Sequence, residues 1–221
     1  MIDYDYDLSD EGELDYEVIG GTIYYMARPK LRHSIISDNL SKNFNNFLED
    51  KDCFYFSDGT ELLIEQILKS QNKLDYLKNL KRGKNKDKEE KLMPDGMIVC
   101  DITDDIILDK NSIDKTPKLV VEILSNLSKK SRQRNEVEKL NIYKEIGVEE
   151  YLIVNPVTFS IKQYSKTGDN NYIENYYAID YENHDVIKFN NMLGFEVKLQ
   201  NVFHKIFNIY TVDTDENEKE R

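Results

Sequence analysis

The sequence predicts one domain of the mixed α/β (α+β) class, in which helices flank a central β-sheet of mixed strand direction. Two observations predict this class. Apolar runs at 97–100, 119–124 and 151–154 are typical of buried strands, and an amphipathic helix over 133–146 lies between the last two. A strand–helix–strand unit pairs its strands in parallel through a right-handed crossover, so these segments should form the centre of the sheet.

The first third of the chain is expected to form a hairpin, a helix and a strand. Residues 16–26 contain the turn pair Gly20-Gly21 between two strand-like runs, which indicates a hairpin. Apolar residues then recur at helical spacing from 33 to 47, and a further strand is expected around 61–64.

The remaining segments are interpreted as parts of a single domain over 14–210. Residues 68–91 are too polar to bury a core of their own, so they are expected to be an insertion. Residues 160–198 should add antiparallel strands, followed by a short closing helix. Residues 1–13 and 211–221 are interpreted as an acidic N-terminal segment and an acidic tail.

Composition and charge limit the class of protein. Hydrophobic residues make up 39% and charged residues 33%, a balance typical of globular proteins, and no apolar run is long enough to span a membrane. The net charge of −12 argues against a broad basic surface for nucleic acid. Basic residues nevertheless cluster at 78–91 and again in four candidates for phosphate binding, Lys129, Lys130, Arg132 and Arg134.

The two cysteines, Cys53 and Cys100, do not indicate a disulfide framework. The acidic N-terminus also lacks the basic-then-apolar order of a signal peptide. Both observations favour a location in the reducing cytoplasm. The sequence contains no phosphate loop, no Gly-x-Gly-x-x-Gly motif and no Gly-x-Ser-x-Gly motif, which argues against the enzyme classes that use them.

Two carboxylates stand where apolar residues or turns are expected. Glu122 interrupts the run 119–124, and a buried carboxylate is costly unless a cation pairs with it or a metal binds it. Asp95 follows Pro94 at the start of the neighbouring strand, where a side chain can remain partly hydrated. Two carboxylates from adjacent strands suit Mg²⁺ or Mn²⁺, which prefer oxygen ligands.

A lysine is expected to join these carboxylates. At about 100° per residue, Lys139 falls on the same helical face as Ile142, Tyr143 and Ile146, and Asn135 shares that direction one turn earlier. A buried lysine beside a metal-bound water can orient the water or offset negative charge in a transition state. The set therefore predicts a site for phosphodiester hydrolysis.

Each residue also has a structural interpretation. Glu122 and Lys139 can form an ion pair that only stabilises the fold. Asp95 after a proline is also typical of a turn. His33 at the start of a helix is more often a satisfied polar residue than a catalyst, and Glu17 in the hairpin can simply face solvent.

Three segments together resemble the Uma2 family of restriction-endonuclease-like proteins, within the PD-(D/E)XK nuclease superfamily. They are Met93-Pro-Asp-Gly-Met-Ile-Val-Cys-Asp101, Val121-Glu-Ile-Leu-Ser125 and the run from Glu138-Lys-Leu-Asn-Ile-Tyr to Val154-Asn-Pro156. The N-terminal Tyr16-Glu-Val-Ile-Gly-Gly, Met26 and His33 also fit. The resemblance covers about residues 14–165 and implies a restriction-endonuclease-like core with an Mg²⁺-dependent site.

The resemblance assigns roles to individual residues. It implies that Asp95 and Glu122 bind metal and that Glu17 and His33 are accessory to the site. The usual lysine two residues after the glutamate is absent, since Leu124 stands there, and the resemblance implies that Lys139 replaces it from the following helix. Asn135 stands where an aspartate is common, which weakens the expected positioning of that lysine.

Two functions therefore follow as expectations. The first is a Mg²⁺- or Mn²⁺-dependent endonuclease with DNA as its expected substrate, which uses Asp95, Glu122 and Lys139. A homodimer is the expected assembly. The alternative is a nuclease-like fold with weak or no activity that acts as a nucleic-acid or protein binding or regulatory module. The acidic net charge and the departures from the family pattern motivate the alternative.

Overall fold

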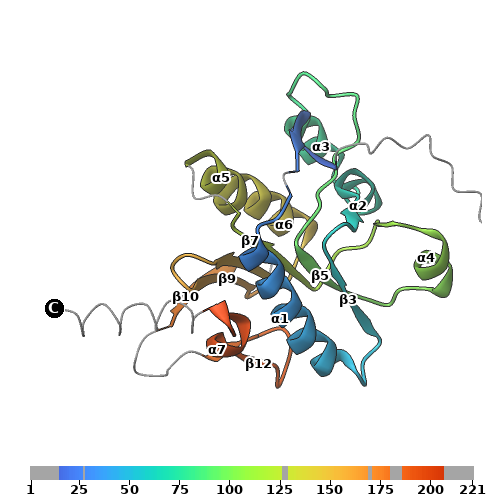
Figure 1. Cartoon of the computed structure of the whole chain (residues 1–221). Coiled ribbons are helices and arrows are strands. Elements are labelled where there is room, and N and C mark those ends of the chain that lie inside the picture. Colours follow the sequence, from blue (N-terminus) through green and yellow to red (C-terminus); the bar gives the residue numbers. More distant parts are fainter. Residues whose placement is uncertain (1–14, 27, 126–128, 169–170, 180–185, 207–221) are drawn as a thin grey trace, which may run out of the picture.

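A six-stranded mixed sheet forms the centre of the molecule (Figure 1). The computed structural model describes residues 15–26, 28–125, 129–168, 171–179 and 186–206, apart from the side chains of Asp105, Asp109, Ser131 and Arg132. The strand order is β10-β9-β8-β7-β5-β3. The strands are β3 (Cys53–Ser57), β5 (Gly96–Cys100), β7 (Leu119–Ile123), β8 (Glu150–Asn155), β9 (Ser160–Lys166) and β10 (Tyr172–Ala178).

The central pairing agrees with the sequence prediction. Strands β7 and β8 are parallel, whereas the other neighbours in this sheet are antiparallel. The mixed α+β class with helices around a mixed sheet is therefore confirmed. Three small two-stranded sheets lie outside it, formed by β1 (Tyr16–Ile19) with β2 (Thr22–Tyr25), β4 (Glu61–Leu62) with β6 (Ser112–Ile113), and β11 (Val186–Lys188) with β12 (Glu196–Lys198).

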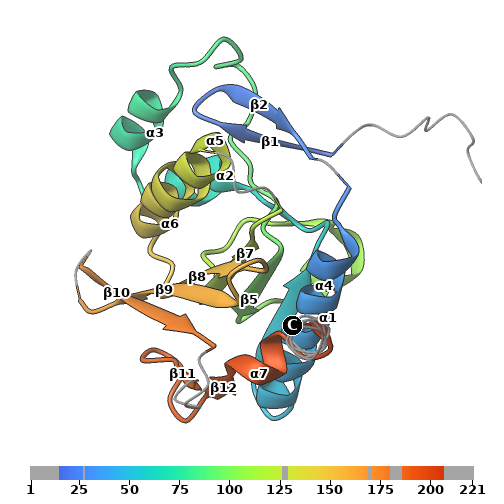
Figure 2. The ribbon, with the colours of Figure 1, turned by 60° about the vertical axis from the view of Figure 1, so that its left-hand side comes forward.

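Helices cover both faces of the central sheet (Figure 2). One face packs on α1 and α7 together with β11 and β12, and the other packs on α2 and α6. The helical elements are α1 (Leu31–Leu48), α2 (Ile64–Ser70), α3 (Leu74–Leu80), α4 (Asp104–Asp109), α5 (Lys129–Gln133), η1 (Arg134–Lys139), α6 (Leu140–Ile146) and α7 (Leu199–Val202).

The alternation of side chains along β7 decides where Glu122 points. Successive residues of a strand face opposite sides of the sheet. Leu119, Val121 and Ile123 pack in the cluster with α1, whereas Val120 packs in the cluster with α6. Glu122 shares the side of Val120, so its carboxylate points toward α6.

The helix after β7 contains a π-helical turn. Elements α5, η1 and α6 run without a break from Lys129 to Ile146, and η1 is the π-helical part. Such turns are rare and are frequently found at functional sites. Asn135 and Lys139 lie in η1 and are both buried. Gly147 then ends the helix with a φ of 88°, as expected for a glycine at this position.

The first third of the chain departs from the prediction in one respect. The strand expected at 61–64 is only the short β4, and α2 begins at Ile64. The edge strand of the central sheet is β3, which pairs with β5 over its whole length. Its residues Cys53–Ser57 include aromatic side chains on both faces, so the segment shows no clear alternation of apolar and polar residues.

The pairing of β3 with β5 also corrects the interpretation of the cysteines. Cys53 lies directly opposite Cys100 in the register of these strands, and the two form a disulfide. This bond was not expected from the sequence. The bond was missed because β3 and its pairing with β5 were not apparent from the sequence.

The polar segment 68–91 packs against the rest of the fold. Leu68 and Leu77 are buried there, and the carboxylate of Glu90 accepts hydrogen bonds from the amides of Gly20 and Gly21, both at 2.7 Å. These contacts anchor the tip of the β1–β2 hairpin. The division of the chain into one domain with an insertion stays a prediction, and its two acidic ends, 1–13 and 211–221, lie outside the described residues.

Within the described part of the chain, no helix combines the length and the apolar character needed to cross a membrane.

Candidate active site

A cleft of about 1310 Å³ opens where the β1–β2 hairpin, the start of α1, the adjoining ends of β5 and β7, and the helix α5–η1 meet. Nearly every site residue expected from the sequence lines this cleft. These residues are Glu17, His33, Asp95, Glu122, Lys129, Lys130, Arg134, Asn135 and Lys139. The side chain of Arg132, also expected here, lies outside the described part of the structure.

Lys139 lies between two buried carboxylates. Its Nζ is 2.8 Å from both carboxylate oxygens of Glu122 and 2.6 Å from Oε1 of Glu17. The hydroxyl of Tyr143, one turn further along the helix, donates to Oε1 of Glu122 at 2.8 Å. The amide of Met93 donates to Glu17 at 3.0 Å. Glu17 therefore does not face solvent, which corrects the structural interpretation of that residue.

The buried groups of this cluster shift one another's pKa values. Burial alone would lower the pKa of Lys139, but Glu122 and Glu17 outweigh it and raise the pKa, so the lysine is charged at neutral pH. Burial raises the pKa of Glu122, and Lys139 opposes that shift. One ammonium group thus lies between two carboxyl groups, of which Glu122 has its pKa raised to about 7.

Asp95 is held between β7 and α1. Its Oδ2 accepts a hydrogen bond from the backbone amide of Ile123, which fixes the side chain beside Glu122. Its Oδ1 lies 3.1 Å from Nε2 of His33, a residue that is buried on the first turn of α1. Burial alone would lower the pKa of His33, but the hydrogen bond and charge of Asp95 outweigh it and raise the pKa.

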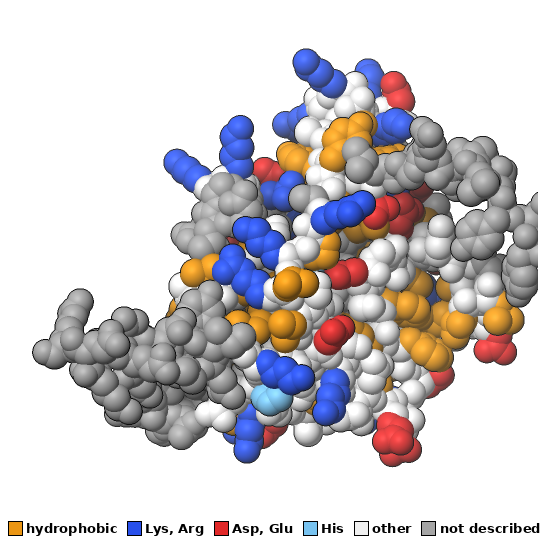
Figure 3. Space-filling view, in the orientation of Figure 1, with side chains coloured by type: hydrophobic (Ala, Val, Ile, Leu, Met, Phe, Trp, Pro, Cys, Tyr) orange, Lys and Arg blue, Asp and Glu red, His pale blue; other side chains and the backbone are white. Residues whose placement is uncertain are grey.

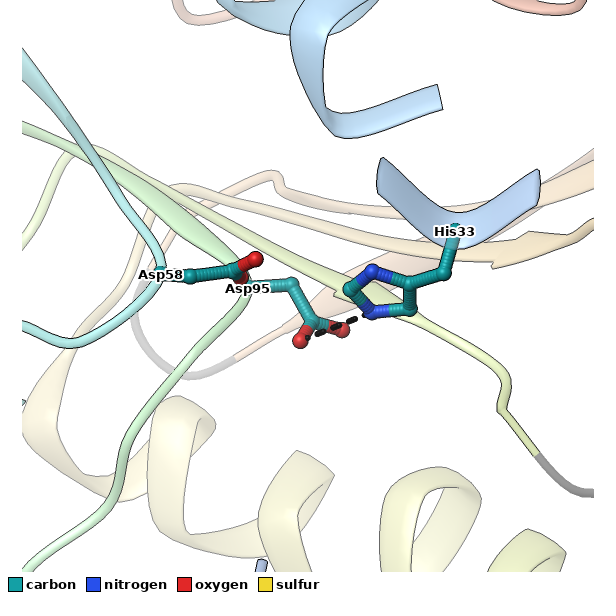
Figure 4. A group of neighbouring side chains, drawn as sticks. All are labelled: His33, Asp58 and Asp95. Carbon is teal, nitrogen blue, oxygen red and sulfur yellow. Dashed lines mark ion pairs between the residues drawn. The ribbon is translucent and has the colours of Figure 1, made fainter. Parts of the chain in front are cut away.

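Asp58, which was not among the site residues expected from the sequence, joins His33 and Asp95. It follows the last residue of β3, and one potential ligand atom from each of the three residues lies within 4.8 Å of the others (Figure 4). Burial and the neighbouring Asp95 raise the pKa of Asp58 to about 6. The available signal was the Ser57-Asp58-Gly59 turn, but its place opposite Asp95 depends on the unpredicted β3–β5 pairing.

Tyr55 is a second residue that sequence reasoning missed. Its ring stacks on Phe44 of α1, and its hydroxyl lies against Gly96, directly after Asp95. A Cβ atom at position 96 would collide with that hydroxyl, so the glycine gives the tyrosine its place. Burial and the charges of Asp58 and Asp95 raise the pKa of Tyr55, which therefore remains a neutral phenol beside them.

Basic residues lie along one side of the cleft. Lys129, Lys130 and Arg134 reach it from α5 and η1, and Arg28 reaches it from the segment after β2. The guanidinium of Arg134 lies 4.9 Å from the ring centre of Tyr24. Lysine and arginine side chains gather over α5 and over α3 on the face shown in Figure 3, with acidic side chains between them.

The geometry around Glu122 agrees in part with a structural ion pair and in part with a hydrolytic site. A direct contact between Glu122 and Lys139 is what a structural ion pair predicts. That interpretation also predicts no open cleft, whereas both residues line one. Asn135 is buried beside them, and its backbone carbonyl accepts a hydrogen bond from the hydroxyl of Tyr151 at 3.1 Å.

A comparison with protein-family models shows to which family this chain belongs. The model of the Uma2 family, described as "Putative restriction endonuclease", matches residues 3–200. The chain belongs to the Uma2 family. This match confirms the resemblance based on the segments around Asp95, Glu122 and Lys139.

A solved structure has a similar fold. It is the crystal structure of a putative nuclease belonging to DUF820 from Anabaena variabilis ATCC 29413. The TM-score is 0.61 at 13% sequence identity, and the alignment covers 87% of this chain and 92% of that one. No curated protein matches the chain. At this identity the likeness concerns the fold, and the family match supports membership among restriction-endonuclease-like proteins.

Proposed function

We propose that this Uma2 protein is a metal-dependent endonuclease that hydrolyses phosphodiester bonds in DNA. The observation that carries the proposal is the buried cluster of Glu122, Lys139 and Glu17, which shares a cleft with Asp95. A cluster of this kind is costly to bury, and the excess of carboxylates over ammonium groups suits a cation as a further member. The family match supports the nuclease class.

The residues present fit a divalent cation. Asp95 and Glu122 would hold Mg²⁺ or Mn²⁺, because both offer carboxylate oxygens from adjacent strands. When bound, such an ion supplies a more acidic water and neutralises charge on the phosphate. Ile123 fixes Asp95 through its amide, and Tyr143 fixes one oxygen of Glu122.

Lys139 has a defined part in this proposal. Its charged ammonium group is held between Glu17 and Glu122 and lines the cleft, so it can stabilise negative charge that develops on the phosphate oxygens. The water oxygen forms the new bond to phosphorus, the bond from phosphorus to the leaving oxygen breaks, and in the net reaction the proton lost by the water goes to the leaving oxygen. Glu17 limits the movement of Lys139 and is therefore a positioning residue.

The basic side of the cleft would bind the DNA backbone. Lys129, Lys130, Arg134 and Arg28 place several positive charges along the opening in a chain of net charge −12. Contacts of this type bind phosphates without reading the sequence and weaken as salt is added. Arg132 is a further candidate from the sequence.

Cleavage assays on the full chain test the proposal. Supercoiled plasmid, linear duplex, single-stranded DNA and RNA are each incubated with Mg²⁺ or Mn²⁺ and with a chelator. We expect metal-dependent cleavage of DNA that Asp95→Asn, Glu122→Gln and Lys139→Met abolish. The control is Glu150→Gln, because Glu150 is a buried carboxylate on β8 that does not line the cleft. Absence of cleavage of every substrate would contradict the proposal.

One observation favours the alternative function, a nuclease-like binding or regulatory module. Both oxygens of Glu122 already contact Lys139, so the carboxylate is partly neutralised without a metal. This function is supported if DNA or protein binding persists in the presence of a chelator while Glu122→Gln leaves binding unchanged. Filter binding or calorimetry with and without Mn²⁺ separates the two functions.

The cytoplasm is the proposed location, because the proposed substrate is DNA. A disulfide between Cys53 and Cys100 is unusual for that compartment, so the state of the two thiols in cells is a direct test. Rapid alkylation in cells followed by mass spectrometry measures it: free thiols would support the cytoplasm, and an intact disulfide would contradict it. A homodimer is the proposed assembly, since two copies of the site can cut the two strands of a duplex together, and light scattering of the purified protein tests it.

A further inference from the structure

We propose that His33, Asp58 and Asp95 form a metal-binding site of their own, which takes Mn²⁺, Co²⁺ or Zn²⁺ in preference to Mg²⁺. The site lies on the oxygen of Asp95 that faces α1, whereas the other oxygen faces β7 and the neighbourhood of Glu122. The proposal rests on the proposed function only in that the two sites share Asp95. Asp58 and the choice of ion are new to it.

The distances suit a single ion. Two donor atoms at right angles, each about 2.1 Å from one cation, lie about 3.0 Å apart. Nε2 of His33 and Oδ1 of Asp95 are 3.1 Å apart, so both can reach one ion without movement of the backbone. The ligand atom of Asp58 lies within 4.8 Å of the other two, a gap that a rotation of its exposed side chain can close. Figure 4 shows the three side chains converging from α1, the turn after β3 and the start of β5.

Two of the three ligands are held in place before an ion arrives. His33 is 5% exposed and belongs to a helix of 18 residues, and Asp95 is fixed by the amide of Ile123. Ligands that are already in position lose little conformational entropy on binding. Asp58 is exposed to the cleft, so it can serve as the ligand through which the ion enters.

The charge around these residues also favours a cation. Among the described residues, Asp95 forms one ion pair, which is with His33, and Asp58 forms none. The neighbouring Lys139 pairs with Glu17 and Glu122 instead. One imidazole thus lies near two carboxylates and contacts only one of them, and a divalent ion would neutralise both.

The imidazole determines which ion is preferred. Nitrogen ligands suit Mn²⁺, Co²⁺ and Zn²⁺ increasingly well along the transition series, whereas Mg²⁺ and Ca²⁺ strongly prefer oxygen. A site of one nitrogen and two carboxylates should thus discriminate against Mg²⁺. The proposed pair Asp95 and Glu122 offers oxygen alone and has no such preference.

Spin-echo spectroscopy of bound Mn²⁺ tests the inference on the full chain. A ¹⁴N modulation of the Mn²⁺ signal reports direct binding to an imidazole nitrogen. The chain has three histidines, His33, His184 and His204, so substitution identifies the ligand. We expect the modulation in the native protein, in His184→Gln, in His204→Gln and in Glu122→Gln, and its loss in His33→Gln.

A second measurement covers the case in which His33→Gln, at a buried position, does not fold. Asp58→Asn changes an exposed residue, and calorimetry should show Mn²⁺ affinity lowered about tenfold or more, with Mg²⁺ affinity nearly unchanged. Asp104→Asn is the matched control, because Asp104 is an exposed aspartate that does not line the cleft, and it should bind Mn²⁺ like the native protein.

The outcomes separate this inference from the proposed function. Bound Mn²⁺ without ¹⁴N modulation, or an affinity that Asp58→Asn does not change, overturns the inference even if DNA is cleaved. Modulation that depends on His33 supports the inference even if no DNA is cleaved, in which case the proposed function fails alone. A protein that binds no Mn²⁺ overturns the inference as well.

Discussion

Glu122 and Glu150 are buried carboxylates on the neighbouring parallel strands β7 and β8, and the fold accommodates them in different ways. Glu122 contacts the charged Lys139, which it shares with Glu17. Glu150 contacts neutral donors, the Ser165 hydroxyl at 2.7 Å, the Gln163 amide at 3.1 Å, and the backbone and side-chain nitrogens of Asn191 at 3.0 and 3.1 Å.

The difference indicates which carboxylate has a role beyond the fold. The oxygens of Glu150 accept hydrogen bonds from protein donors, and this side chain is fully buried and does not line the cleft. Glu122 lines a cleft, and Lys139, which it contacts, also forms an ion pair with Glu17. A buried charge is therefore a poor guide to function until its partners and its access to solvent are known.

The largest expected effect comes from removing the shared cation. Lys139→Met leaves Glu17 and Glu122 buried beside each other without a positive charge, so we expect the free energy of unfolding to fall by about 3–5 kcal/mol. Chemical denaturation at neutral pH measures it. Lys162→Met is the matched control, because Lys162 pairs with Glu136 at a half-exposed position and should cost less than about 1 kcal/mol.

A double variant sharpens this test. Combining Glu122→Gln with Lys139→Met leaves a single buried carboxylate, so part of the lost stability should return. If Lys139→Met alone costs as little as Lys162→Met, the charged cluster is not what distinguishes Glu122 from Glu150.

The second effect concerns the hydroxyl that orients Glu122. Tyr143→Phe removes a hydrogen bond to a buried carboxylate, and we expect a loss of about 1.5–3 kcal/mol in stability together with weaker metal binding. Thermal shift with and without Mn²⁺ measures both. Tyr172→Phe is the control, since that hydroxyl donates to the neutral backbone carbonyl of Val148 and lies away from the cleft. Equal effects of the two variants would count against the special role of Tyr143.

Periodicity along single elements made the centre of the site predictable. Glu122 was visible as the one charge in an apolar strand, and Lys139 as the one charge on an apolar helical face. Since both patterns are local, they could be extracted without knowing the tertiary structure. The parallel pairing of β7 and β8 followed from the order of elements and is observed.

The rest of the site depends on contacts between segments far apart in the sequence. Asp58 approaches Asp95 through the pairing of β3 with β5, and the same pairing joins Cys53 to Cys100. The strand β3 shows no alternation that would have revealed it, so both features were missed together. Glu17 was interpreted as solvent-facing for a related reason, because its burial depends on the hairpin packing over η1.

The third effect tests the other carboxylate. Glu150→Gln places an amide NH₂ group beside donors that form hydrogen bonds with the carboxylate in the native protein. Because this group cannot accept those hydrogen bonds, we expect a loss of about 1–3 kcal/mol in stability. DNA cleavage and Mn²⁺ affinity should not change, because Glu150 lies outside the cleft. Denaturation and calorimetry on the same preparation measure both quantities. A change in Mn²⁺ affinity would remove the distinction between the two carboxylates.

The smallest effect is in the pH dependence of the same variant. Burial raises the pKa of Glu150 above its ordinary value of 4.5, although Ser165 and Asn191 oppose the shift. The folded state therefore binds this proton more tightly than the unfolded state, and the contribution of Glu150 to stability is greatest below pH 4.5 and falls as the pH rises through the folded pKa. Glutamine at 150 does not titrate, so the unfolding free energy of the native protein minus that of Glu150→Gln should fall as the pH rises from 4.5 through the folded pKa. A difference that rises over this range would mean that the neutral donors around Glu150 favour its charged form more strongly than burial disfavours it.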